Sequence, residues 1–117
     1  MTDKTPAQLA DTAGDAIRAL NHATLSTRPD WEYPGDAYSV VGNLAYMAGM
    51  LPQAIEQITQ LLTTLEGENH LKSDRDTLGD DLEAAYAGLH IAAGAAETLR
   101  GALTRAQNGL GAVAYKD

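Results

Sequence analysis

The chain has 117 residues, of which 44% are hydrophobic and 21% charged, a composition that suits one folded domain and argues against general disorder. Its formal net charge of −8 repels phosphate backbones, so we expect no direct binding of nucleic acid. The absence of cysteine excludes disulfides, thiolate metal sites and cysteine nucleophiles.

The first residues, MTDKTPAQLADTAG, lack the basic start and the apolar run of a secretory signal. Every apolar stretch is interrupted well short of the roughly 20 residues that span a bilayer. We therefore expect a cytoplasmic protein with no membrane partner. An acidic surface can also imitate nucleic acid for a basic partner, and we keep this mimicry as a minor alternative to ordinary solubility.

A first helix is predicted over about residues 6–24. Thr5 suits the N-cap, Pro6 suits the first helical position, and Gln8 stands where a capping box needs it. Apolar residues then recur at steps of four and three, which predicts one face turned toward a core: Leu9, Ala13, Ala16, Leu20 and Ala23.

The next segment, WEYPGDAY, is an aromatic cluster that includes the only tryptophan and two of the five tyrosines. It can act as a structural lid over the end of a bundle, or as a binding hot spot, in which tryptophan and tyrosine are enriched. As a lid it would cover the C-terminal end of the third helix. The candidate partner-binding cluster comprises Trp31, Tyr33, Tyr38 and Tyr115.

A second, long helix is predicted over residues 36–66, with Asp36 as its cap. Pro52 would ordinarily break a helix. The heptad spacing continues through it, which favours one helix kinked at Pro52 over two short ones. The seam is formed by Ala37, Val41, Leu44, Ala48, Leu51, Ile55, Ile58, Leu62 and Leu65, and Val40, Met47, Ala54 and Leu61 widen it on one flank.

A third helix is predicted over residues 74–112, after a turn in EGENHLKS, with Ser73 and Asp76 at its cap. Its seam again advances by steps of four and three. The residues that flank the seam have small side chains or none, which favours close helix packing. The seam residues are Leu78, Leu82, Ala85, Leu89, Ala92, Ala96, Leu99, Leu103, Ala106 and Leu110, and the flanking residues are Gly88, Ala95, Ala102 and Gly109.

These elements predict a single all-α domain, an antiparallel three-helix bundle dominated by a long helical hairpin. Folding the chain back at residue 70 places Pro52 opposite Gly88. Helix 1 is too short to cover the whole of helix 2, so the tip of the hairpin should lack a third helix and self-associate as a homodimer. The predicted self-interface comprises Ile55, Ile58, Leu62, Leu65, Leu78 and Leu82, although a different helical protein could cover the same tip.

The motifs of catalysis give no positive signal. Although GLGAVA matches a nucleotide-binding pattern by letters, no strand precedes it, and the chain has neither a Walker loop nor G-x-S-x-G. The histidines fit no metal motif and are predicted to be solvated, and the acidic residues between 74 and 83 suit a helix start. We predict no catalytic, cofactor-binding or metal site.

The segments AIRALNHAT and WEYPGDAYSVVGNLAYMAGMLPQAIEQI resemble small uncharacterised helical proteins of actinobacteria. The resemblance covers roughly the first half of the chain and implies no activity. The hairpin also invites comparison with the WXG100 family, but the turn lacks Trp-x-Gly and the tail YKD does not fit that family's C-terminal signal, so we do not adopt it.

The sequence therefore predicts a non-enzymatic protein–protein interaction or assembly module. The alternative is a helical bundle that binds a small apolar ligand or a metal in a cavity near Pro52 and Gly88. Tyr46, Met50, Tyr86 and Ile91 fall outside the seams, so they either form an adaptable interaction face or fill a core between helices 1 and 3.

Overall fold

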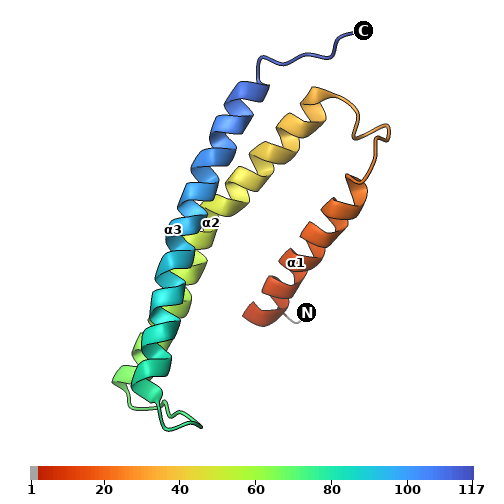
Figure 1. Ribbon diagram of the computed structural model, residues 1–117. Helices are drawn as coiled ribbons and strands as arrows, with labels where there is room; N and C mark the ends of the chain where they lie inside the picture. Colours follow the sequence, from red (N-terminus) through yellow and green to blue (C-terminus); the bar gives the residue numbers. More distant parts are fainter. Residues whose placement is uncertain (1–2) are drawn as a thin grey trace.

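The computed structural model describes residues 3–117 and consists of three helices (Figure 1). They are α1 (Pro6–Ala23), α2 (Pro34–Gly67) and α3 (Leu78–Leu110), and the described residues contain no strand beyond an isolated bridge between Arg28 and Trp31. The helices α2 and α3 pack along each other as an antiparallel hairpin, and the molecule is 65 Å in its longest dimension. The predicted all-α class and the dominant hairpin are confirmed.

Helix α1 begins as its sequence predicts. The Gln8 backbone N–H donates to the Thr5 hydroxyl at 3.1 Å, and the Thr5 N–H donates to the Gln8 side chain at 2.9 Å, which completes the capping box. The helix ends at Ala23, where the Thr24 hydroxyl donates to the Leu20 carbonyl at 2.9 Å. Thus α1 is defined at both ends by bonds within its own segment.

Helix α2 is continuous through Pro52, as predicted, and Figure 1 shows it changing direction about halfway along. It begins at Pro34, two residues earlier than expected, because proline is already set for the first helical turn. Asp36 still serves the helix start. Its carboxylate accepts the backbone N–H groups of Glu32 and Tyr33, each at 2.9 Å.

The predicted start of the third helix, residue 74, was four residues too early, because the residues before Leu78 form a structured turn. Asp76 has a left-handed φ of 59°, which ends any helix upstream of it. The Ser73 hydroxyl, expected as a cap, instead donates to Asp81 at 2.5 Å and accepts the Arg75 N–H at 3.2 Å. Thr77 is therefore the residue before the first turn of the helix.

This longer turn also shifts the register of the hairpin. The Gln107 side chain lies over Gly42, and a Cβ at Gly49 would stand 2.9 Å from Cδ of Arg100. In an antiparallel hairpin the residue numbers of such pairs add to a constant, and for these two pairs the sum is 149. The predicted fold-back at residue 70, which placed Pro52 opposite Gly88, corresponds to a sum of 140. Pro52 lies near Ala93 rather than Gly88, since both line one groove, and a Cβ at Gly88 would meet nothing within 4 Å.

Helix α1 does not join the hairpin in a bundle. Among the residues that the structure describes, no Cα of α1 lies within 8 Å of a Cα of α2 or α3, and Figure 1 shows α1 beside the hairpin. The predicted packing of helix 1 on helix 2 is therefore wrong. The connection of residues 24–33 bends back at Arg28 and Trp31, whose backbones exchange hydrogen bonds of 3.2 and 2.8 Å.

The hairpin alone has almost no core. Only Ala45, Ala48, Leu82 and Ala96 are buried among the apolar side chains described. The accessible surface is 9070 Å², whereas a folded monomer of this mass exposes roughly 6,100 Å². The radius of gyration is 19.3 Å, against about 13 Å for a compact domain of this length. The chain therefore exposes far more surface than a self-sufficient domain does.

The open space around the glycines of α3 leads to a first prediction. A Cβ at Gly94 meets nothing within 4 Å, so Gly94→Ala should raise the free energy of unfolding by about 1 kcal/mol through helix propensity alone. Gly49→Ala should gain less, because its Cβ must displace Arg100. Urea unfolding followed by far-UV circular dichroism measures both. A loss of stability in Gly94→Ala would show that a close neighbour packs there.

Candidate interaction surfaces

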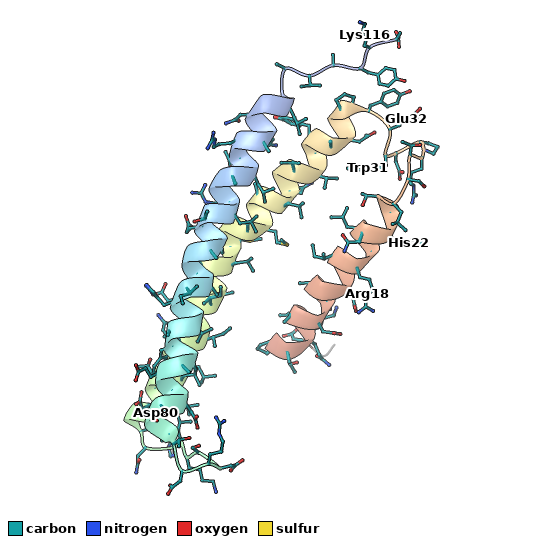
Figure 2. The ribbon with its side chains drawn as sticks, in the orientation of Figure 1. Arg18, His22, Trp31, Glu32, Asp80 and Lys116 are labelled. Carbon is teal, nitrogen blue, oxygen red and sulfur yellow. The ribbon has the colours of Figure 1, made fainter. Side chains whose placement is uncertain are left out.

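The aromatic cluster gathers at the end of the hairpin opposite the 68–77 turn. The rings of Tyr33 and Tyr115 meet edge to face with centroids 4.9 Å apart, and a Cβ at Gly111 would lie 3.7 Å from the Tyr38 ring. Figure 2 shows Trp31 and Lys116, from the loop and the tail, at this end of the molecule. Tyr33 and Tyr38 thus lie against the segment that follows α3, and the two interpretations of the cluster, a lid or a binding hot spot, stay predictions.

The predicted ranges, 36–66 and 74–112, made the third helix longer than the second, so that its C-terminal end would extend past helix 2 beneath this lid. Such an overhang is absent, because α2 and α3 have almost equal lengths of 34 and 33 residues. The tail after Leu110 supplies Tyr115 instead. Trp31 is half-buried and borders a hollow of ≈ 210 Å³ together with Thr27, Glu32, Tyr33 and Ala37. The other three aromatic residues of the cluster stay exposed, so much of their surface is open to a partner.

Asp36 fixes the geometry of this corner. The N–H groups of Glu32 and then Tyr33 hold the pKa of the Asp36 carboxyl below its ordinary value of 3.8, against a smaller opposite effect of desolvation. The same bonds bring the loop onto the first turn of α2. The corner is therefore ordered by an ionised carboxylate.

Asp81 plays the matching role at the other end. Its carboxylate accepts bonds from the Ser73 hydroxyl, from Arg75 at 2.7 Å and from Thr77 at 3.2 Å. The Ser73 bond contributes most to lowering the pKa of Asp81, while desolvation opposes it. Sequence reasoning placed Asp81 in an acidic helix start and missed this network, because its donors all come from an irregular loop.

The six residues predicted as a self-interface are unequally placed. Leu82 is buried, with 9% of its surface exposed, whereas Ile58 is 49% exposed, and the remaining four are half-buried. Leu61, treated as a flank residue, is 59% exposed and adds more open surface to the tip than most of them. The available apolar surface at the tip therefore centres on Ile58 and Leu61.

The residues outside the seams do not fill a core between α1 and α3, because no Cα of α1 lies within 8 Å of a Cα of α3. Tyr46, Met50 and Ile91 are exposed. Tyr86 is half-buried, and its hydroxyl donates to the Glu66 carboxylate at 2.9 Å. Desolvation, together with the Glu66 charge, raises the pKa of the Tyr86 phenol.

One side of the hairpin carries an open groove of ≈ 330 Å³ near the middle of α2, where the sequence predicted a cavity at Pro52. It is lined by polar and apolar side chains from both helices: Pro52, Ile55, Glu56, Thr59, Tyr86, Leu89, His90 and Ala93. Among residues 3–117 no three histidine or acidic side chains gather as a metal site requires. His22, His70 and His90 are exposed, as expected.

No helix within the described part of the chain is both long and apolar enough to cross a membrane. No protein-family model matches the chain, and neither a curated protein nor a solved structure is significantly similar to it. The resemblance to actinobacterial helical proteins therefore stays a prediction.

The lowered pKa of Asp36 predicts an acid response at the aromatic corner. A depressed carboxyl pKa gives stability that is complete above the unfolded-state value, about 3.9, and is lost as the pH falls through the lower folded-state value. Below pH 4 the emission of Trp31, the only tryptophan, should therefore shift toward that of solvent-exposed indole.

Asp36→Ala should produce the same shift at neutral pH and remove most of the acid response. Glu32→Ala is the matched control, because it keeps the backbone N–H that Asp36 accepts. An Asp36→Ala protein with the parental emission and the parental acid response would contradict this role of the carboxylate.

Proposed function

We propose that the protein is a non-enzymatic interaction module that self-associates as a homodimer through the apolar surface of the hairpin, including its tip. The observation that carries the proposal is the accessible surface of 9070 Å², roughly 3,000 Å² above that of a compact monomer of this mass. Stable homodimers bury about 2,000–5,000 Å² in total. The excess surface is large enough to supply such an interface. A cytoplasmic location belongs to the same proposal.

The composition of α2 supports it. The only charged side chains along this helix are Asp36, Glu56 and Glu66, although it is exposed on several sides. A helix in contact with water usually carries charges on its exposed face. Depletion of charge together with exposed tyrosine, methionine and leucine is the composition of an interface core. Thus α2 is suited to contact protein rather than water.

The groove beside Pro52 supports a second candidate, the binding of a small and largely apolar ligand. It is the one feature of the described hairpin that joins apolar walls with a hydroxyl, an imidazole and a carboxylate, from Tyr86, His90 and Glu56. Its open form gives a ligand little enclosure. The dimer is favoured because it accounts for exposed apolar surface over the whole hairpin.

Two charges at the tip should abolish the dimer. Ile58→Glu combined with Leu61→Glu places carboxylates on side chains that are about half exposed, so each chain should keep its helices. Light scattering across a dilution series should give twice the chain mass for the parent and the chain mass for the variant. Gln60→Glu, on the same turn of α2, is the control and should remain dimeric. An unchanged dimer in the double variant would contradict an interface at the tip.

Heat stability separates the two candidate functions. A dimer binds its partner only when folded, so its melting temperature should rise with protein concentration, by mass action. A ligand module should instead melt independently of concentration and gain stability with added ligand. A differential scanning fluorimetry series from low to high micromolar protein, with and without a panel of apolar small molecules, decides between them.

A further inference from the structure

The structure carries a more specific inference, which rests on the proposed self-association: the way in which the two copies meet. Two rows of residues run along one side of the hairpin at alternating steps of three and four. The α2 row, which is mostly large, comprises Leu44, Met47, Leu51, Ala54, Ile58 and Leu61. The α3 row, which is mostly small, comprises Ala85, Gly88, Ala92, Ala95, Leu99 and Ala102.

Both rows lack a covering element in the described chain. All six residues of the α3 row are exposed, including Leu99 at 45%, and the last four residues of the α2 row are exposed as well. Gly88 has no neighbour that would explain it, since a Cβ there meets nothing within 4 Å, as is also found at Gly94 and Gly101 outside the row. A glycine inside a helix costs about 1 kcal/mol relative to alanine, so an external close contact would account for it.

The two rows lie on the same side of the hairpin. Glu56 of α2 and His90 of α3 both line the groove beside Pro52, so their side chains share one side. Two residues further along α2, Ile58 points about 200° away from Glu56, and two residues earlier on α3, Gly88 points about 200° away from His90. Both therefore face the side opposite the groove.

The rows also match in height along the hairpin. Glu56 and His90 lie near the middle of the groove-lining residues on each helix, and their position numbers sum to 146. The glycine contacts give the larger sum of 149 because Gln107 and Arg100 reach those glycines with long side chains, which in a helix point toward its N-terminus. Within the two rows, Leu44 stands level with Ala102, Leu51 with Ala95, Ile58 with Gly88 and Leu61 with Ala85, each pair again summing to 146. Four of the five large residues of α2 are thus level with a small residue of α3, and the fifth, Met47, is level with Leu99.

We infer that a second copy packs face to face on these rows, related by a two-fold axis parallel to the helices. This axis keeps each residue at its height and exchanges left for right, so the large α2 row of each copy lies on the small α3 row of the other. All neighbouring helices are then antiparallel, as in a four-helix bundle. An axis perpendicular to the helices would instead set the large rows against each other.

Cysteine pairs test this arrangement directly, because the chain has no cysteine of its own. Ala54 and Ala92 are level and exposed, so a mixture of Ala54→Cys chains and Ala92→Cys chains should form a disulfide-linked heterodimer under mild oxidation. The matched control is a mixture of Glu56→Cys and His90→Cys chains, which are equally level but line the groove on the opposite side. That mixture should not form a linked heterodimer.

A size exchange supplies a second test that does not depend on disulfide chemistry. Ala95→Leu adds bulk at an exposed helical site, so the single chain should fold, but the added side chain should collide with Leu51 of the second copy and weaken the dimer about tenfold or more. Adding Leu51→Ala in the same chain should restore most of the affinity, because the total volume is kept. Sedimentation equilibrium gives the dissociation constants.

The outcomes distinguish this inference from the proposed function. A linked Ala54–Ala92 heterodimer with a negative control, together with rescue by the size exchange, is the expected result. A parent that is dimeric but gives no Ala54–Ala92 link would overturn the face-to-face arrangement and leave self-association standing. A parent that stays monomeric at all concentrations would overturn both.

Discussion

The rest of the structure depends on the close approach of α2 and α3 along small residues. Where α3 lies nearest, α2 presents Gly42, Ala45, Ala48 and Gly49, and side chains from α3 cover the two glycines. Small residues on this line let the backbones approach closely, in the manner of ridges fitting grooves. Three large apolar residues of α2, Leu51, Ile58 and Leu61, consequently lie to the side of the contact and stay exposed.

A hairpin of this kind gains little stability from its own contact. Burial of apolar surface contributes about 25 cal/mol per Å², and the side chains buried here are three alanines and one leucine. None of the four buried side chains belongs to α1, and no Cα of α1 lies within 8 Å of a Cα of α2 or α3. Most of the stability of a helix in a protein comes from packing of its amphipathic face, and α1 has little such packing in this chain. Covering the exposed faces of α2 and α3, as the proposed self-association would do, would therefore add to the stability of the hairpin.

Sequence periodicity predicted the helices, because each carries a stripe repeated over several turns, and it correctly carried α2 through Pro52. It failed at the 68–77 turn, because hydrogen bonds from three loop residues to Asp81 and the left-handed backbone of Asp76 have no periodic signal. That local error shifted the register of the hairpin. The stripe of α1 likewise predicted a partner but could not say whether this chain supplies it, so the bundle packing was wrong while the amphipathic helix was right.

Contacts at the two ends of the hairpin hold α2 and α3 in one register. The Asp81 network fastens the turn at one end, and Tyr33 with Tyr115 and Tyr38 with Gly111 fasten the loop and the tail at the other. Between them the buried part of the contact is formed by three alanines and one leucine. A slip of one turn would move Ile58 off the level of Gly88. The polar turn and the aromatic corner thus fix the register on which the match between the two exposed rows depends.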